Sequence, residues 1–171
     1  MNKSLGMMAL AGLLLLAVPI LAHQDAPLER AVSDALLSLP HYGVFDNLAF
    51  AVNGPDVVLS GQVVLPITKD EAAKRVQRIK GIGKVVNSIE VLPLSPSDDA
   101  VRKNAYRALF GTSDLHKYSM GANPSIHIIV KGGHITLVGV VSSQSDADLA
   151  LLSIRGVPGA QSQKSLLKIA K

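Results

Sequence analysis

The sequence predicts an α+β protein made of two tandem α-β-β-α-β units that follow an N-terminal signal peptide. Each unit is expected to be a small three-stranded sheet with two helices packed on one face. Three observations predict this: an apolar run near the N-terminus, a match of the chain with itself at a constant offset, and alternation of helical and strand-like hydrophobic spacing within each matched unit.

The composition is that of a folded chain. Its 171 residues are 48% hydrophobic and 18% charged, which allows a buried core. The formal net charge of +4 is mildly basic and lies below the charge density of a dedicated nucleic-acid binder. The chain has no cysteine, and this excludes disulfides, thiolate nucleophiles and cysteine-ligated metal sites.

Residues 1–22 have the organisation of a secretory signal peptide. Lys3 precedes the apolar run LGMMALAGLLLLAVPILA, which ends at the small Ala22 before the polar HQDAPLER. We expect cleavage after Ala22 and a periplasmic mature protein. Ile20 at the −3 position is less typical than alanine, so an uncleaved membrane anchor is the alternative. After residue 22 no apolar run is long enough to span a bilayer.

The internal match relates two copies of one unit. LSGQV (59–63) aligns with LVGVV (137–141), 78 positions further along the chain. At the same offset Asp70 aligns with Asp148 and Ile89 with Leu167. The repeat therefore extends from the strands into the following helix and the closing strand.

Each unit is predicted to begin with a helix. Apolar residues at helical spacing place one helix at 28–39 and another at 101–109. Ser97 is the expected N-cap of the second helix, and Asp98 and Asp99 are favourably placed against its dipole.

A β-hairpin follows in each unit. The turn Gly132-Gly133 would pair Lys131 with His134, and this register pairs Ile128 with Leu137. The first unit has its turn at Gly54-Pro55. The register places these apolar side chains on one face of each hairpin: Leu48, Phe50, Val52, Val57 and Leu59 in the first, and Ile126, Ile128, Val130, Ile135 and Leu137 in the second.

A second helix and a closing strand complete each unit. Thr68 and Glu71 have capping-box spacing, and Ser145 with Asp148 approximates it. The closing strands are VVNSIEVL and KSLLKI. Four glycines are expected at structural turns: Gly61, Gly81, Gly139 and Gly159. Two prolines in LPLSPSDD indicate a linker, so the expected organisation is signal peptide 1–22, first unit 27–92, linker 93–97 and second unit 98–170.

The run IKGIGK (79–84) has two interpretations. Apolar-Gly-apolar-Gly before a lysine is typical of DNA-binding helix-hairpin-helix turns. The matching stretch 157–162 keeps only the glycine at 81, as Gly159, and has Ser162 in place of Lys84. A strand-like sequence follows instead of a second helix. We therefore expect Gly81 to end a helix with positive φ and IGK to lead into the closing strand.

Together these segments resemble the BON domain, a family named for a bacterial osmotically inducible periplasmic protein and for nodulation. VVLSGQV…KGIGKVVNSIEV and ITLVGVV…GVPGAQSQKSLLKI carry the resemblance, which covers about residues 27–169. It implies an exported, non-enzymatic protein associated with envelope integrity, osmotic stress and phospholipid surfaces. The connection GTSDLHKYSMGANP (111–124) is longer than its counterpart in the first unit and departs from the family pattern.

No catalytic or metal site is expected. His127 and His134 would lie on the outer face of the second hairpin, about 13 Å apart at about 3.3 Å per residue, too far to share an ion. They are therefore interpreted as surface histidines. Ser142, Ser143 and Ser145 lack a nucleophile-elbow motif and suit N-capping. The acidic residues show no pairing suited to acid–base catalysis, so we expect neither enzyme activity nor a cofactor.

The first helix of the second unit carries the candidate lipid-binding site. On a helical wheel with Val101 at the centre of the apolar side, the opposite side carries two aromatic and three cationic residues: Arg102, Lys103, Tyr106, Arg107 and Phe110. Lys117 and Tyr118 in the following loop extend the set. Such rings would enter a lipid interface while the cations meet phosphates. The alternative is that Tyr106 and Phe110 pack against the other unit.

The distribution of charge favours the second unit for this role. Residues 23–97 hold seven Lys/Arg and eight Asp/Glu, whereas residues 98–171 hold nine and five. A basic run on the second helix of the first unit has the ordinary interpretation of a solvated helix face: Lys74, Arg75, Arg78, Lys80 and Lys84.

The functional prediction is a non-enzymatic binding protein at anionic phospholipid surfaces that supports cell-envelope integrity or osmotic-stress tolerance. The alternative is a protein-interaction or structural module of the periplasm, which would bind an envelope protein or self-associate. DNA binding through IKGIGK is disfavoured because the export signal opposes it, so no nucleic acid is expected as a partner.

Overall fold

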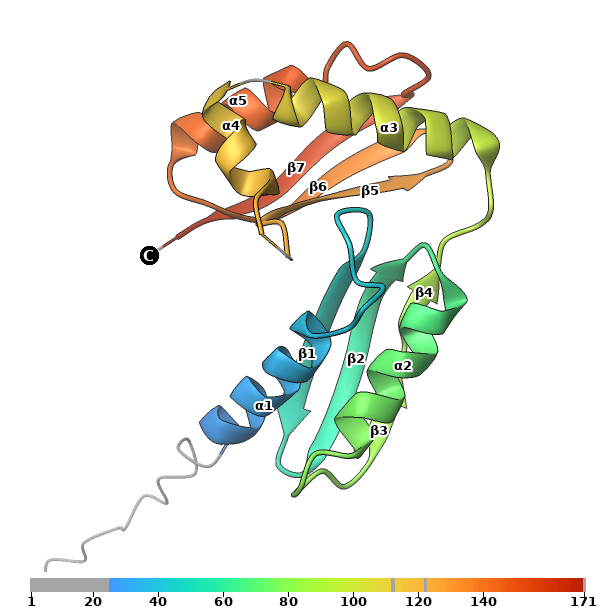
Figure 1. The fold of residues 1–171 in the computed structure, drawn as a ribbon, viewed down its shortest axis with the longest axis vertical. Coiled ribbons are helices and arrows are strands. Elements are labelled where there is room, and N and C mark those ends of the chain that lie inside the picture. Colours follow the sequence, from blue (N-terminus) through green and yellow to red (C-terminus); the bar gives the residue numbers. More distant parts are fainter. Residues whose placement is uncertain (1–24, 112, 122, 171) are drawn as a thin grey trace, which may run out of the picture.

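The computed structural model describes residues 25–111, 113–121 and 123–170 of the chain. Two α+β units follow one another, each with its helices on one face of a small sheet (Figure 1). The predicted fold class is thereby confirmed. The expected signal peptide, residues 1–22, lies outside the described residues.

The first unit has the predicted order of elements. They are α1 (Asp25–Leu37), β1 (Asn47–Asn53), β2 (Asp56–Val63), α2 (Pro66–Gln77), β3 (Val85–Asn87) and β4 (Glu90–Val91). β1 pairs antiparallel with β2, and β3 and β4 both pair parallel with β2. The closing strand of this unit is therefore one strand position, interrupted between β3 and β4.

The second unit repeats this order with an insertion after its first helix. Its elements are α3 (Pro96–Phe110), α4 (Ser113–His116), the 3-10 helix η1 (Lys117–Ser119), β5 (Ile126–Lys131), β6 (His134–Val141), α5 (Gln144–Ser153) and β7 (Ser162–Ile169). The sheet order is β5-β6-β7, with β6 and β7 parallel. α4 and η1 form the longer connection that the sequence indicated.

Each unit has its own hydrophobic core between the helices and the sheet. The predicted hairpin register is confirmed: Lys131 pairs with His134 and Ile128 with Leu137, and in the first unit Phe50 pairs with Leu59. Ile126, Ile128, Val130, Ile135 and Leu137 are all buried in the second core. Period-two alternation predicts the inward face of each hairpin because a one-residue slip would turn all of these side chains to the opposite face of the sheet.

The predicted helix starts are wrong by two or three residues. Ser95 caps α3 in place of Ser97, and its side chain accepts from the Asp98 amide. α2 begins at Pro66, so Thr68 lies inside the helix, where it is buried, and cannot form a capping box with Glu71. Ser143, and not Ser145, caps α5. Proline at the first helical turn needs no amide partner and has a helical φ, and this sets the early starts of α2 and α3.

Two of the four predicted turn glycines lie inside strands. Gly81 and Gly159 have positive φ, 96° and 83°, in the turns after α2 and α5. The C-cap of α2 is Arg78, three residues before Gly81, so Gly81 shapes the turn and does not end the helix. Gly61 and Gly139 lie in β2 and β6. IKGIGK leads into β3, as expected, so a strand and not a second helix follows it directly.

A loop of the first unit packs against the second unit. Residues 41–46, here called the joint loop, run between α1 and β1 and lie close to β5 of the second unit (Figure 1). The Ile128 amide donates to the Val44 carbonyl at 2.7 Å. No helix in the described part of the chain has the length and hydropathy needed to cross a bilayer.

Candidate functional site

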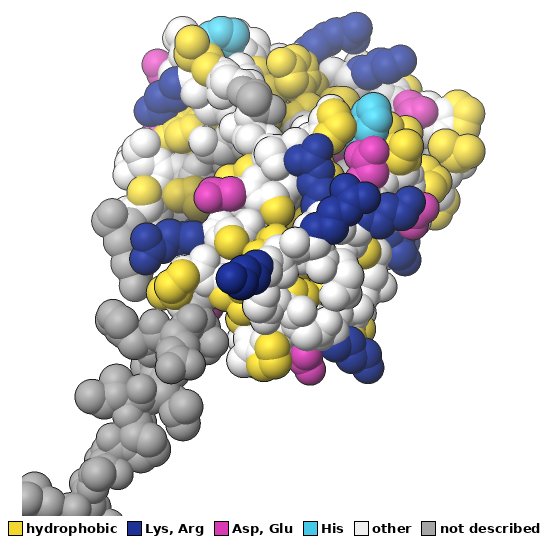
Figure 2. Space-filling view, turned by 60° about the horizontal axis from the view of Figure 1, so that its bottom comes forward, with side chains coloured by type: hydrophobic (Ala, Val, Ile, Leu, Met, Phe, Trp, Pro, Cys, Tyr) yellow, Lys and Arg dark blue, Asp and Glu magenta, His cyan; other side chains and the backbone are white. Residues whose placement is uncertain are grey.

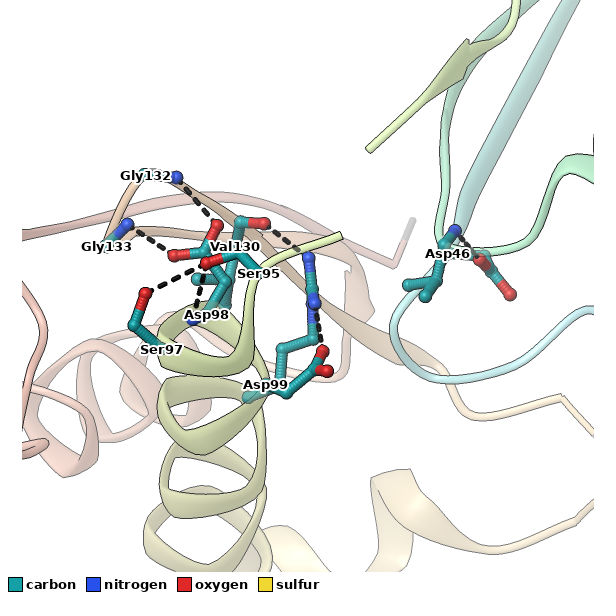
Figure 3. A network of polar contacts seen from close by, with 10 residues as sticks. Asp46, Ser95, Ser97, Asp98, Asp99, Val130, Gly132 and Gly133 are labelled. Atoms are coloured by element: carbon teal, nitrogen blue, oxygen red, sulfur yellow. Dashed lines mark hydrogen bonds and ion pairs between the residues drawn. The ribbon is translucent and has the colours of Figure 1, made fainter. Parts of the chain in front are cut away.

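The first turn of α3 is bound firmly to its own sheet. The buried carboxylate of Asp98 accepts hydrogen bonds from the Gly132 and Gly133 amides at 2.8 and 2.7 Å (Figure 3). These amides form the tight turn between β5 and β6. Asp98 therefore positions α3 along the sheet in addition to its predicted place near the helix dipole.

Arg102 does not face outward, and its predicted exposure is wrong. Its side chain is 3% exposed, pairs with Asp99 and donates from Nη2 to the Val130 carbonyl at 2.8 Å. The buried arc of α3 runs from Val101 through Leu109 to Arg102, at about 0°, 80° and 100° on the wheel. The wheel prediction centred this arc too far from Arg102.

Phe110 and Tyr118 are also buried, each 6% exposed, contrary to the prediction. The Tyr118 hydroxyl donates to Asp146 Oδ2 at 2.6 Å and accepts from the Ser142 amide at 2.8 Å. Lys117 is exposed and pairs with the same carboxylate at 3.2 Å. The Tyr118 hydroxyl, followed by Lys117, holds the pKa of Asp146 below its ordinary value. These contacts hold the first turn of α5 in place, and they do not extend an exposed lipid-binding face.

Three of the predicted α3 residues are on the surface: Lys103, Tyr106 and Arg107. Tyr106 is 39% exposed, and its ring meets the edge of Phe45 at a centroid distance of 6.3 Å and the Phe110 ring at 5.0 Å. Val44 and Phe45 pack against the second core. The alternative interpretation placed both Tyr106 and Phe110 against the other unit. Tyr106 does contact Phe45 of the first unit but stays partly exposed, whereas Phe110 belongs to the core of its own unit.

The joint loop supplies residues that sequence reasoning did not include. Both oxygens of the buried Asp46 carboxylate accept backbone amides, Gly43 at 2.9 Å and Val64 at 2.7 Å, and this holds the loop against the end of β2. Burial raises the pKa of Asp46. The loop therefore presents Val44 and Phe45 to α3. The sequence does indicate this contact, because Val44 and Phe45 form an apolar pair in a loop between helix and strand, where polar residues are typical.

The prediction that His127 is a surface histidine is also wrong. It is 8% exposed and stacks on Tyr42 with a centroid distance of 5.2 Å. Its Nδ1 lies 3.1 Å from the Gly43 carbonyl and its Nε2 lies 3.4 Å from the Tyr42 hydroxyl. A carbonyl only accepts, so Nδ1 carries the hydrogen, and Nε2 accepts from Tyr42 in the neutral imidazole. Burial lowers the pKa of His127.

The exposed residues form one surface that neither unit has alone. We call it the composite patch and define it by Val44, Phe45, Lys103, Tyr106 and Arg107. These residues surround a hollow of about 320 Å³. A second hollow of about 380 Å³ adjoins it, with Val44, Phe45 and Lys103 common to both. Figure 2 shows one face of the molecule, where Lys and Arg side chains lie among hydrophobic ones.

Surfaces outside the composite patch are weaker candidates for a binding site. A hollow of about 580 Å³ lies between the face of β6 and β7 that no helix covers and the end of the first sheet, where Lys131 pairs with Glu90 at 2.6 Å. His134 is exposed, as predicted. Across residues 25–111, 113–121 and 123–170, no three His, Asp or Glu side chains lie close enough to hold a metal ion.

Both units match a known family. Residues 24–93 and 98–170 each match the BON domain. No curated protein matches the chain. Among solved structures, CdsD, a structural protein of the type III secretion system of Chlamydia trachomatis, is 14% identical with a TM-score of 0.32, over 84% of this chain and 92% of that one. The C-terminal domain of CdsD is 13% identical with a TM-score of 0.29, over 83% and 96%. At these TM-scores the likeness carries no functional conclusion.

Proposed function

Because the chain belongs to the BON domain family through both of its repeats, we propose that it binds anionic phospholipid surfaces and thereby supports the cell envelope. BON domains are in general binding domains without catalytic activity. The N-terminal sequence supports export to the periplasm, where such surfaces are available. The composite patch is the proposed contact.

The observation that carries the proposal is the combination of exposed rings and unpaired cations on the composite patch. Tyr106 is 39% exposed and Phe45 is half-buried beside it, and Lys103 and Arg107 line the same hollow. Neither cation has an ion-pair partner among the described residues. Both cations are therefore free to meet lipid phosphates, while the rings occupy the headgroup level.

The binding mechanism is electrostatic attraction combined with shallow apolar insertion. A lysine or arginine near an anionic membrane surface contributes about 1 kcal/mol, and this contribution falls with ionic strength. The first unit supplies Phe45 and the second supplies Tyr106, so docking of the two units assembles the contact. No bond is made or broken.

Vesicle co-sedimentation tests the proposal. The mature protein should sediment with phosphatidylglycerol vesicles at low salt, and not with phosphatidylcholine vesicles. Lys103→Ala/Arg107→Ala should weaken binding by roughly thirtyfold, because two cations contribute about 2 kcal/mol.

Lys164→Ala/Lys168→Ala is the matched control, because it removes two exposed cations from β7, outside the composite patch. It should bind within about threefold of the unmodified protein. Absence of sedimentation with phosphatidylglycerol would reject the proposed function. Equal weakening in the two double variants would reject the composite patch as its site.

A further inference from the structure

The second hollow of about 380 Å³ has the character of a ligand pocket. We call it the joint pocket. Its apolar walls come from the joint loop and from the two residues that follow β2: Val44, Phe45, Val64 and Leu65. Its volume is within the range of about 300–1,000 Å³ that small-ligand sites occupy. Lys103 lines both this pocket and the composite patch, so the two are continuous.

Of the buried polar side chains that line the joint pocket, Asp46 and Arg102, only Arg102 has a polar atom without a partner among the described residues. Asp46 accepts two backbone amides, and Asp99 pairs with Arg102. The Arg102 guanidinium uses Nη1 and Nη2, but its buried Nε has no hydrogen-bond partner among the described residues. An unsatisfied buried donor is costly, so an acceptor oxygen beside Arg102 would be stabilising.

We propose that the joint pocket holds the upper part of one acyl chain of an anionic phospholipid. The phosphate lies at Lys103 and Arg107 on the composite patch. The ester carbonyl oxygen lies beside Arg102, and the first methylenes lie between Phe45 and Leu65. The inference rests on the proposed function and specifies how a single lipid is held.

The lining favours an acyl chain over the other occupants. An apolar hollow holds water poorly, because water needs several polar partners. A peptide segment would bring several backbone donors and acceptors, whereas the buried side chains of the lining offer a single unpartnered donor, Arg102 Nε. Each acyl chain of a phospholipid brings one ester carbonyl and an apolar tail, and the headgroup brings a phosphate. For one chain and the phosphate, the counterparts here are Arg102, the apolar walls and the cations of the composite patch.

Gly43 allows the pocket to be filled without strain. It lines the joint pocket and does not have positive φ, and an added Cβ would have Asp46 Oδ2 at 3.9 Å as its nearest neighbour. Gly43→Leu therefore adds bulk where a chain would lie and leaves the backbone hydrogen bonds of Gly43 in place. Gly156→Leu is the matched control, because an added Cβ at that exposed glycine meets nothing within 4 Å.

The experiment uses two soluble probes: dihexanoyl-phosphatidylglycerol below its micelle concentration, and glycerophosphoglycerol, which has the same headgroup without chains. The unmodified protein should bind the first at least tenfold more tightly. Methyl NMR signals of Val44, Val64 and Leu65 should shift with the first probe only. Gly43→Leu should lose at least fivefold in affinity for it, whereas Gly156→Leu should match the unmodified protein.

Three outcomes would overturn the inference: equal affinity for the two probes, unchanged affinity in a folded Gly43→Leu protein, or methyl shifts that do not include the pocket. The methyl shifts decide the matter in the unmodified protein if the variant does not fold. Failure of the unmodified protein to sediment would reject the proposed function instead, and the probe titration would still judge the pocket.

Discussion

At the scale of single residues, the two strand glycines carry the same constraint in both units. Gly61 and Gly139 have φ of 113° and 126°, and they occupy equivalent places 78 positions apart. An added Cβ would overlap the carbonyl oxygen of Asn47 at the first and of Ser125 at the second. Close approach of the neighbouring backbone therefore explains why glycine recurs there.

Gly139→Ala should destabilise the protein by about 3 kcal/mol, because it combines positive-φ strain with a clash against backbone. Urea unfolding followed by circular dichroism would measure this. Gly156→Ala, in open space without positive φ, should stay within about 0.5 kcal/mol. Equal effects of the two substitutions would show that the clash is relieved by a small backbone shift.

At the scale of elements, α3 shows which features helical spacing predicts and which it does not. The spacing of Val101, Ala105 and Leu109 identified the helix and its buried side. The burial of Arg102 and Phe110 could not be derived from it. Arg102 is buried because a carbonyl of β5 accepts from it, and Phe110 belongs to the core against which the joint loop packs. Both are long-range contacts, about which local periodicity contains no information.

Asp98→Ala should detach the start of α3 from the β5–β6 turn. It would leave the Gly132 and Gly133 amides without their acceptor, and we expect a loss of about 3 kcal/mol in the free energy of unfolding. Asp148→Ala removes an exposed carboxylate whose only described contact is with Gln144, and it should cost less than about 0.5 kcal/mol. Similar losses in both variants would contradict the role assigned to Asp98.

At the scale of the whole molecule, the packing of the joint loop on the second unit involves a neutral histidine. His127 lies between Tyr42 and the Gly43 carbonyl, with the Asp46 carboxylate nearby. Its folded-state pKa lies below the ordinary 6.5, so as the pH falls through 6.5 the unfolded chain takes up a proton before the folded one does. Stability contributed by His127 is therefore full above 6.5 and declines as the pH falls toward the folded-state pKa.

We expect the thermal unfolding midpoint of the protein to fall more between pH 7.5 and pH 5.5 than that of His127→Gln. Glutamine can still donate to the Gly43 carbonyl, but it does not titrate. Asp46 acts in the opposite direction, because its raised pKa makes the folded state hold a proton more tightly as the pH falls toward 3.8. It is present in both proteins, so the difference between them isolates His127. Parallel pH profiles would contradict the buried, neutral imidazole.

The sequence by itself determined the two α-β-β-α-β units, the hairpin registers and the IKGIGK run as an approach to a strand. Hydrophobic period and repeat spacing are local properties that survive in any tertiary context. Only the tertiary structure decided which side chains of α3 face solvent, where His127 lies and that Phe45 meets Tyr106. These depend on how the joint loop of one unit packs on the other, and the two sides of that contact are about 60 to 85 residues apart in the chain.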